Sequence, residues 1–498
     1  MQSTRDQVQA HMFVMGRLTS GMLRGDPDAP ESPQGRTNRG IALGVVIAVL
    51  LSAGAFVFGL LKPGTKDSWK EARTLVIDKS TGSRYLYLDG RLRPVRNYTS
   101  ARLLAGAEMK TATVRGASLA DTPHGAPVGI SGAPEALPPG GALDTGPWQV
   151  CSATATSSAG TTLAVGVAAD GASLPAGQGL LVRGPDRATY LVWRGSKLRL
   201  AERAGATEAL GYGSTPPVPV AAAFLNSLPS GPDLAPPEVP GRGSRGPRLG
   251  GRETRVGEVF RITVPGSAGR YYLLRREGLG PVTATTAALV LGDPRTRRTV
   301  YAGTASAAVL GADVLRGHQA PADRRGDVQA ARVLPDTPPR AMSVERGQVP
   351  CARVEASGAG TRVSVALVGQ AGLGPAAQPP PENFTPACTP VGRVVVRPGG
   401  GVLVHALGAG GGEVGDTVYL VTDTGMKYRV ASEQTMTALG YTARQARRLP
   451  APLLAMLPTG PDLSPQAAST GHGPTTATGC EPVRHPSGRT SQSADKKR

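Results

Sequence analysis

One uncharged, apolar stretch constrains the fold of this chain more than any other feature. Residues 40–61 read GIALGVVIAVLLSAGAFVFGLL and hold no Asp, Glu, Lys or Arg. The 21 positions from Ile41 to Leu61 would span about 31 Å as a helix that rises 1.5 Å per residue, which matches the hydrocarbon core of a bilayer. The sequence therefore predicts one transmembrane helix near the N-terminus.

A cleaved signal peptide is the competing interpretation of this stretch, because the segment from Ser52 to Ala55 resembles a weak cleavage site. Nearly forty residues precede the stretch, however, and it stays apolar beyond the small residues. Both observations favour a retained anchor. The flanking charges do not orient the anchor, because arginines just before it face lysines soon after it.

The composition limits the classes of protein that remain. Gly and Pro supply 67 and 45 of the 498 residues, which favours loops and short strands over long helices. The net charge of +19 would suit an anionic partner such as nucleic acid or a wall polymer. The arginines are scattered along the chain, however, and aromatic residues make up only 4%, too few for a base-stacking platform. We therefore expect no nucleic-acid partner.

The clearest internal pattern is a nine-residue segment that occurs twice. LPSGPDLAP occupies residues 228–236 and LPTGPDLSP occupies residues 457–465. We expect each copy to form the turn that closes a repeat. The pairs that keep the same offset of 229 positions are Tyr190 and Tyr419, Tyr212 and Tyr441, and Asp233 and Asp462. Constant spacing over such a distance indicates an internal repeat.

A smaller unit recurs four times. Each copy has an apolar run, a turn glycine and a second apolar run, which predicts a β-hairpin. A Ser- or Thr-led stretch that runs to a glycine follows each hairpin and predicts a short helix. We expect the tyrosines that begin the apolar runs to be core residues. These tyrosines are Tyr85, Tyr190, Tyr271 and Tyr419, and the turn glycines are Gly90, Gly195, Gly278 and Gly425.

Two of the four cysteines occupy matching positions in a third pair of similar segments. WQVCSATATSSAGTTLAVGV from residue 148 aligns with GQVPCARVEASGAGTRVSVALV from residue 347, which matches Cys151 to Cys351. A bond between equivalent residues of two halves would place both within about 3.5 Å of the axis that relates the halves. Two buried free thiols are the alternative. Cys388 and Cys480 have no counterparts, so a bridge between them has no support from the repeats.

No motif in the sequence points to catalysis, a metal or a cofactor. GxxxxGK[ST], GxSxG and HExxH are absent. GxGxxG occurs at 241–246 and 410–415, but neither copy follows a strand and opens a helix, so we take both as chance matches in a Gly-rich chain. A carboxylate pair of Asp233 and Asp462 is less consistent with the sequence than two aspartates in turns. We expect no catalytic residue.

The residues ahead of the anchor form an amphipathic pattern. Val8, Met12, Met15, Leu18 and Met22 recur at near-helical spacing beside arginines between residues 5 and 24. Such a helix could dock on membrane proteins or lie on the bilayer surface.

The same N-terminal stretch carries a family resemblance. TRDQVQAHMFVMGRLTSGMLRGDPDAPESPQGRTNRG, followed at once by one anchor, resembles the start of the EccB family, a core component of actinobacterial type VII (ESX) secretion machines. The likeness continues through VGISGAPEALP at 128–138, the matched cysteines and both nine-residue segments. It favours docking over surface binding for the N-terminal helix.

The resemblance implies a fold and a topology. It implies an α+β protein with a cytoplasmic N-terminus, a single transmembrane helix and a pseudo-twofold extracytoplasmic body of four hairpin-and-helix repeats around a central β domain. It also implies a disulfide between Cys151 and Cys351, and leaves Cys388 and Cys480 outside the family pattern. The expected segments are 1–39 (N-terminal amphipathic segment), 40–61 (transmembrane helix), 62–116 (repeat 1), 117–172 (central β domain, first part), 173–235 (repeat 2), 236–256 (linker), 257–295 (repeat 3), 296–390 (central β domain, second part, with a Pro-rich linker), 391–465 (repeat 4) and 466–498 (disordered tail).

The resemblance also implies partners. These would be an EccC-like motor ATPase, an EccD-like channel and an EccE-like subunit, with homo-oligomerisation inside the complex. The family's repeats are similar to a wall-binding fold of phage lysins, so an anchored cell-wall-binding module is the alternative function. ATPase activity is sometimes described for the family, but we do not expect it here because no Walker motif is present.

Overall fold

The computed structural model describes residues 4–25, 33–61, 68–153, 158–167, 169–263, 269–321, 334–358, 360–377, 384–408 and 412–475. The chain divides into two compact units. The first comprises Met1–Glu71 and Val114–Asp121, and the second comprises Ala72–Thr113 and Thr122–Arg498.

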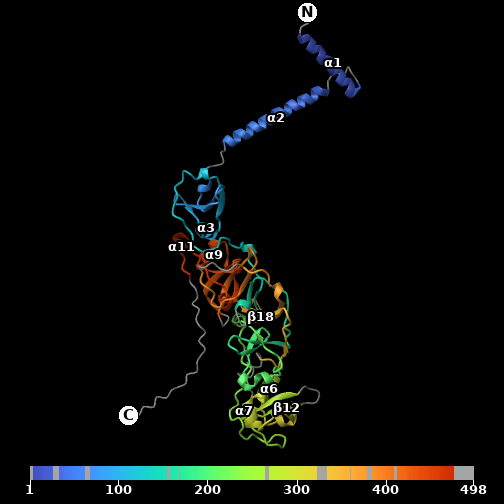
Figure 1. Cartoon of the computed structure of the whole chain (residues 1–498), viewed down its shortest axis with the longest axis vertical. Coiled ribbons are helices and arrows are strands. Elements are labelled where there is room, and N and C mark those ends of the chain that lie inside the picture. Colours follow the sequence, from blue (N-terminus) through green and yellow to red (C-terminus); the bar gives the residue numbers. More distant parts are fainter. Residues whose placement is uncertain are drawn as a thin grey trace, which may run out of the picture. The chain divides into compact units, whose positions relative to one another are not determined.

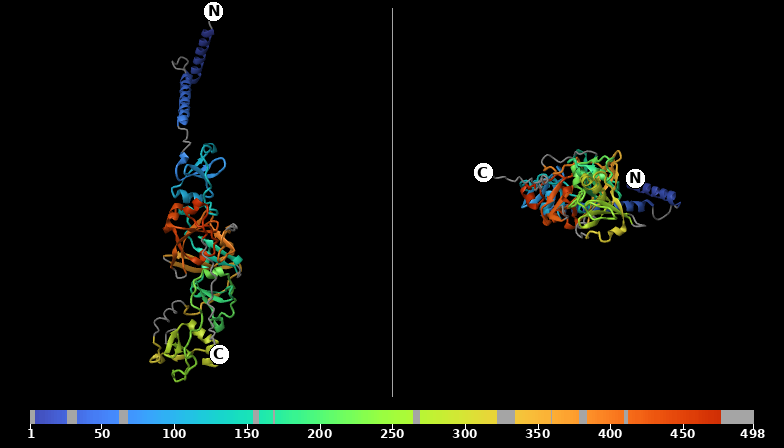
Figure 2. Two further views of the ribbon diagram at one scale, coloured as in Figure 1. Left: turned by 90° about the vertical axis from the view of Figure 1, so that its left-hand side faces the viewer. Right: turned by 90° about the horizontal axis from the view of Figure 1, so that it is seen from below.

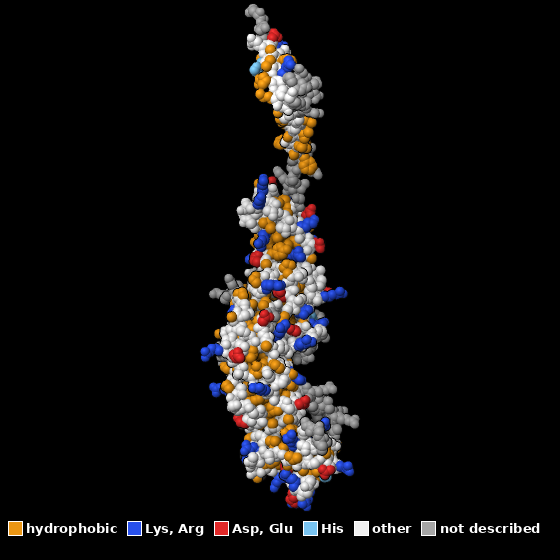
Figure 3. All heavy atoms as spheres, turned by 90° about the vertical axis from the view of Figure 1, so that its right-hand side faces the viewer, with side chains coloured by type: hydrophobic (Ala, Val, Ile, Leu, Met, Phe, Trp, Pro, Cys, Tyr) orange, Lys and Arg blue, Asp and Glu red, His pale blue; other side chains and the backbone are white. Residues whose placement is uncertain are grey.

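The first unit contains two long helices (Figures 1 and 2). They are α1 (Thr4–Arg24) and α2 (Pro33–Leu61), and the short helices η1 (Ser68–Lys70) and η2 (Gly116–Ser118) complete the unit. Helix α2 begins before residue 40 because Pro is well tolerated in the first turn of a helix. Its stretch Thr37–Phe58 has a mean hydropathy of 2.7, is exposed (Figure 3), and is long and apolar enough to cross a membrane.

The second unit contains five sheets, which we call the first, second, third, fourth and central sheets. Their strand orders are β3-β2-β1-β4, β10-β9-β8-β11 with β16 also on β8, β14-β13-β12-β15, β22-β21-β20-β23, and β19-β6-β5-β17-β18-β7. The strands are β1 (Thr74–Asp78), β2 (Arg84–Leu88), β3 (Arg91–Pro94), β4 (Lys110–Val114), β5 (Trp148–Ser152), β6 (Thr161–Val165), β7 (Gly171–Ser173), β8 (Gln178–Arg183), β9 (Thr189–Trp193), β10 (Ser196–Arg199), β11 (Val218–Pro219), β12 (Val259–Thr263), β13 (Arg270–Arg275), β14 (Gly278–Val282), β15 (Ala308–Gly311), β16 (Arg340–Met342), β17 (Gln348–Ser357), β18 (Gly360–Gly369), β19 (Arg393–Val396), β20 (Gly401–Leu407), β21 (Glu413–Thr422), β22 (Lys427–Val430) and β23 (Arg447–Pro450).

Short helices connect these strands. They are α3 (Tyr98–Ala105), α4 (Ala206–Ala209), α5 (Ala222–Asn226), α6 (Ala284–Gly292), α7 (Pro294–Thr296), α9 (Glu433–Leu439), α10 (Ala451–Leu454) and α11 (Pro465–Thr470). Single-turn helices are η3 (Gly140–Ala142), η4 (Ser158–Gly160), η5 (Glu202–Ala204), η6 (Arg297–Tyr301), η7 (Ala312–Leu315), η8 (Gln370–Leu373) and η9 (Ala443–Gln445).

The four smaller sheets share one strand order. Three consecutive antiparallel strands are followed by a helix and by a strand that returns beside the first of the three. That returning strand is parallel to the first strand in the second, third and fourth sheets. The hairpin and helix of each unit match the sequence pattern, whereas the first and last strands were not predicted.

Two of the hairpin turns show why the pattern was readable. Asp89 and Gly90 have φ angles of 51° and 72°, and Arg194 and Gly195 have φ angles of 48° and 75°. Two consecutive positive φ angles define the turn type that matches the twist of a two-residue hairpin, and Gly adopts them without strain.

The helices that follow the hairpins are capped less uniformly than expected. Thr283 caps α6 and Ser432 caps α9 through their side-chain oxygens. Asn97, ahead of the predicted Ser/Thr stretch, caps α3, and no side chain caps α4. Asn accepts the same backbone hydrogen bond as Ser or Thr, so the cap shifts without loss of the helix.

The central sheet separates two hydrophobic clusters. Successive residues of a strand face opposite sides, so Val150 and Ala352 lie in a large cluster while Cys151 and Cys351 lie in a smaller one. The large cluster also includes residues of the second sheet, such as Leu180, and residues of the fourth sheet. Three sheets therefore share one core.

Two segments are more ordered than we expected. Residues 236–256, expected as a linker, include a small hairpin on the third sheet, and Leu249 is fully buried beside Phe260. Helix α11 occupies the start of the expected disordered tail and packs on α3 (Figure 1). Each segment carries apolar side chains that the folded body buries, which outweighs its Gly, Pro or Ser content. The rest of the tail, residues 476–498, lies outside the described residues.

Candidate functional site at the paired cysteines and repeated segments

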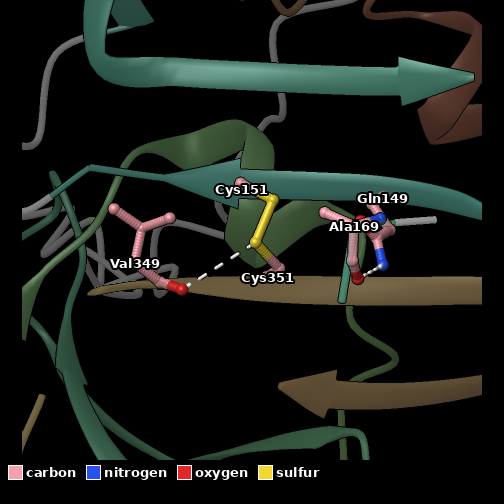
Figure 4. Close-up of a disulfide and its surroundings, with 5 residues drawn as sticks. All are labelled: Gln149, Cys151, Ala169, Val349 and Cys351. Atoms are coloured by element: carbon pink, nitrogen blue, oxygen red, sulfur yellow. Dashed lines mark hydrogen bonds between the residues drawn. A yellow bond between two sulfur atoms is a disulfide. The ribbon is translucent and has the colours of Figure 1, made fainter. Parts of the chain in front are cut away.

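The structure joins Cys151 of β5 to Cys351 of β17 by a disulfide (Figure 4). The two residues are directly opposite in an antiparallel ladder, and their Cα atoms are 4.0 Å apart. Both are fully buried among Val349, Ala366 and neighbouring apolar side chains. The bond closes a sequence separation of 200 residues, so it ties the two halves of the second unit together.

Gln149 lies beside the disulfide (Figure 4). Its side chain accepts a hydrogen bond from the Ala169 backbone at 2.9 Å and donates one to the Ala169 carbonyl oxygen at 3.3 Å. Gln149 is 1% exposed, so this reciprocal pair satisfies a buried amide and fixes Ala169, which belongs to the same apolar cluster as the two cysteines. Cys388 is also disulfide-bonded, whereas Cys480 lies outside the described residues.

The repeated nine-residue segment is an extended stretch that pairs with a sheet through isolated bridges, rather than the closing turn that we expected. In the fourth sheet, Lys427 donates its backbone N–H to Pro458 at 3.0 Å, and Gly460 donates to the Lys427 carbonyl oxygen at 2.9 Å. In the second sheet, Lys197 bonds Pro229 and Gly231 in the same way, at 3.0 and 2.9 Å. Each segment therefore runs parallel to the second strand of a hairpin, β10 in the second sheet and β22 in the fourth.

The first sheet has a counterpart that sequence reasoning missed. Residues 122–130 read TPHGAPVGI and run parallel to β3. Leu92 donates to Pro123 and Gly125 donates to Leu92, each at 2.9 Å. The shared signal is Pro, any residue, Gly, at the point where the segment joins the sheet.

Two lysines, buried Lys427 and partly buried Lys197, occupy the same position in the fourth and second sheets. The Lys427 side chain donates to the carbonyl oxygens of Leu454 and Leu457, at 2.5 and 3.0 Å. The Lys197 side chain donates to the Leu225 carbonyl oxygen at 2.6 Å. Burial disfavours the charged amine, which lowers the pKa of Lys427 to about 8 and lowers the pKa of Lys197. Both lysines cap the end of a short helix.

The structure places Asp233 and Asp462 in different surroundings on separate sheets. Asp462 is 4% exposed and pairs with Arg429 of β22 at 3.1 Å. Asp233 is exposed on the second sheet. The two aspartates therefore do not form a shared carboxylate site. Asp462, which we expected to act in a turn, forms an ion pair with an arginine of β22.

Two buried tyrosines bond across the halves of the chain. The Tyr212 hydroxyl donates to the Pro339 carbonyl oxygen at 2.8 Å, and the Tyr441 hydroxyl donates to the Pro138 carbonyl oxygen at 2.7 Å. Burial raises the pKa of Tyr212 to about 12 and raises the pKa of Tyr441 further. Both therefore stay protonated and act as donors at neutral pH.

The described residues contain no cluster of His, Cys, Asp and Glu that could hold a metal ion. The GxGxxG at 241–246 lies in the hairpin on the third sheet, while part of the copy at 410–415 lies outside the described residues. The disulfide, hydrogen bonds and ion pairs described above are suited to holding segments of the second unit in fixed positions.

The apolar stripe of α1 is exposed, and none of the residues that the structure describes covers it. Val8, Met12, Met15, Leu18 and Met22 are between 50% and 81% exposed. Apolar side chains aligned along one helix mark a surface that contacts protein or lipid.

Comparison with known proteins identifies the family. The family model described as type VII secretion system ESX-1, transport TM domain B, matches residues 1–476. The ESX-3 secretion system ATPase EccB3 of Mycolicibacterium smegmatis is 30% identical over 485 residues, which cover 94% of this chain and 90% of that protein. The protein of the same description from Mycobacterium tuberculosis is 30% identical over 500 residues, which cover 94% and 89%.

Two solved structures share the fold. A chain of an intact ESX-5 inner membrane complex has a TM-score of 0.61 at 23% identity and covers 94% of this chain and 95% of its own length. The EccB3 dimer from the ESX-3 core complex gives a TM-score of 0.60 at 27% identity, with coverage of 79% and 99%.

An apolar helix ahead of a sheet-rich body, with a family match over nearly the whole chain, defines a membrane component of type VII secretion. The chain belongs to the EccB family.

Proposed function

We propose that this chain is a structural core subunit of a type VII secretion machine, which assembles with an EccC-like motor ATPase, an EccD-like channel and an EccE-like subunit. The open apolar stripe of α1, next to an apolar helix long enough to cross a membrane, carries this proposal. A stripe of this kind is buried when a partner helix covers it, which stabilises an assembly by about 25 cal/mol per Å² of apolar surface removed from water.

The arrangement of the second unit supports a rigid, duplicated body. The Tyr212 bond runs from the second sheet to the segment ahead of β17, and the Tyr441 bond runs from the fourth sheet to the segment ahead of β5. Each long repeat is thereby bonded to the opposite half. Helix α4 likewise packs on α6, and α9 packs on α3.

These contacts between the two halves are the ones that a twofold axis at the disulfide would generate. Directly opposite residues of an antiparallel pair are related by a local twofold, and Cys151 faces Cys351. Two halves around that axis, with the segment boundaries expected from the sequence, account for the paired contacts. We infer that the body organises the complex as one unit.

The disulfides support an orientation. Disulfides persist in oxidising compartments, so the body that contains Cys151, Cys351 and Cys388 belongs outside the cytoplasm. The segment ahead of the anchor then belongs inside, where α1 can meet a motor ATPase. The solved relatives, which come from inner membrane complexes and include a dimer, support an oligomer within the complex.

Polar substitution of the α1 stripe tests the proposal. Val8→Ser, Met12→Ser and Met15→Ser together should abolish type VII secretion and the co-isolation of the motor and channel subunits, while the chain stays in the membrane fraction. The matched control replaces Gln9, Ala10 and Phe13 with Ser, on the opposite side of the same helix, and should secrete normally. Normal secretion by the stripe variant would overturn the structural role.

The alternative function is an anchored wall-binding module. It predicts that the stripe variant secretes normally and that the chain sediments with purified cell wall. The relatives are named ATPases, but no Walker motif occurs in this sequence, so we expect no nucleotide hydrolysis by this chain. ATP turnover that keeps a constant specific activity through purification of the full chain would contradict that expectation.

A further inference from the structure

The third sheet and the hairpin that covers it are unusually rich in arginine. Residues 239–320 contain thirteen arginines against five acidic residues, whereas the whole chain has 55 lysines and arginines in 498 residues. Because arginine occurs throughout the chain, the sequence predicted no nucleic-acid partner and did not single out this stretch. The fold places the stretch on the third sheet and its attached segments.

The covering hairpin holds its arginines in fixed places. Arg245 pairs with Arg255, and Leu249 pairs with Arg252, as antiparallel bridges. Buried Leu249 anchors the hairpin in the core of the third sheet. Arginines on such an anchored hairpin lose little further conformational entropy when they bind a ligand.

The acidic residues nearby leave most of this charge uncompensated. Asp293 is buried and forms an ion pair with Arg242, and Glu258 is buried and binds Arg252 at 3.2 Å. Arg248 and Arg255 instead donate to carbonyl oxygens, at 3.0 and 3.3 Å. Because a guanidinium has five N–H donors, these contacts leave donors for an anion.

A pocket of about 470 Å³ is formed by α7, η6 and the residues that follow them. Its lining contains Arg297 and Arg298 and no carboxylate. The hairpin adjoins η6, since a Cβ built on Gly243 would lie 3.0 Å from the Thr299 carbonyl oxygen. Arg255 donates to the Gly243 carbonyl oxygen, so it lies on the part of the hairpin that adjoins η6, although it does not line the pocket itself.

We propose that the pocket lined by Arg297 and Arg298, together with Arg255 of the hairpin, binds an anionic polysaccharide through its phosphate or carboxylate groups. Guanidinium groups bind both anions in a bidentate manner. The lining holds no aromatic side chain on which a nucleic-acid base could stack, which disfavours nucleic acid. The biological setting rests on the extracytoplasmic orientation proposed above, whereas the binding itself does not depend on secretion.

Direct binding to the full chain in detergent tests this site. The probes are a phosphodiester-linked polyol, polygalacturonate and neutral dextran, measured at low and high salt. The chain should bind one or both anionic probes and not dextran, with affinity that falls as salt rises. Preference for the phosphate or the carboxylate polymer would identify which anion the site takes.

Two matched variants separate a built site from general charge. Replacement of Arg255, Arg297 and Arg298 with Gln should weaken binding about tenfold or more at low salt, because three anion contacts are lost. Replacement of the exposed residues Arg91, Arg96 and Arg346 with Gln removes equal charge elsewhere and should leave binding within about twofold. The thermal midpoint of each variant verifies its fold.

Three results would overturn the proposal. They are equal losses in both triple variants, no binding of either anionic polymer by the parent chain, or equal affinity for single-stranded DNA that is lost in the same variant. Each leaves the role in secretion untouched, because that role is tested through α1.

Discussion

The two copies of the nine-residue segment make the same backbone hydrogen bonds and meet very different surroundings. Both run parallel to the second strand of a hairpin and form backbone hydrogen bonds with a lysine there, Lys197 in one sheet and Lys427 in the other. In the second sheet the middle of the copy is largely exposed, including Pro232 and Asp233. In the fourth sheet residues 457–463 are all buried.

A segment outside the repeat explains the difference. Thr385 and Thr459 exchange backbone hydrogen bonds at 3.1 and 2.9 Å, so the end of the Pro-rich insertion pairs with the second copy. The ring of Phe384 lies over Gly460, where an added Cβ would come within 3.0 Å of it. One motif therefore fixes the backbone, and its neighbours decide how much each side chain contributes to stability.

The largest expected effect comes from the bond that joins the two halves. Cys151→Ser with Cys351→Ser should lower the free energy of unfolding by roughly 5 kcal/mol, because the disulfide closes a 200-residue separation. Tryptophan fluorescence during denaturant unfolding of the full chain in detergent measures the change. An unchanged unfolding midpoint would show that packing alone holds the halves.

The two lysines give the next effect. Lys427→Ala should cost about 3 kcal/mol, since it leaves two buried carbonyl groups without their donor and opens a cavity. Lys197→Ala removes one such bond from a less buried position and should cost about 1 kcal/mol. Equal losses of stability in the two variants would contradict the difference between the copies.

Substitution of the two aspartates should also cost more stability in the second copy than in the first, but the difference should be smaller than for the lysines. Asp462→Asn should cost about 2 kcal/mol, because it leaves partly buried Arg429 without its carboxylate. Asp233→Asn lies on the surface and should change stability by less than about 0.5 kcal/mol. Thermal midpoints of both variants at neutral pH provide the comparison, and a larger shift for Asp233→Asn would reverse it.

A pH dependence provides a further test of the buried Lys427. The pKa of Lys427 is about 8 in the folded chain and near its ordinary 10.5 when unfolded. Between these values the unfolded state binds more protons, so the contribution of Lys427 to the free energy of unfolding rises with pH. The thermal midpoint of the parent relative to Lys427→Met should therefore increase between pH 7.5 and 9.5. A constant difference would contradict burial of the amine.

Local chemistry explains what could be predicted. The Asp89-Gly90 turn and the charge-free run before residue 62 express backbone and solvation preferences that act within a few residues. The first strands of the sheets, such as Thr74–Asp78, and the last ones, such as Arg447–Pro450, have no clear alternation and form through pairing with distant residues. The segment at 236–256 was misjudged for a related reason, since a single buried Leu249 anchors it despite its Gly and Arg content.

The sequence by itself determined the anchor, the repeated hairpins and the matched cysteines, because length, hydropathy and spacing are properties of the chain. Only the tertiary structure decided that the nine-residue segments pair with the sheets and that Asp462 is buried while Asp233 is exposed. The reason is physical: burial depends on which distant segments arrive beside a residue, and identical motifs receive different neighbours.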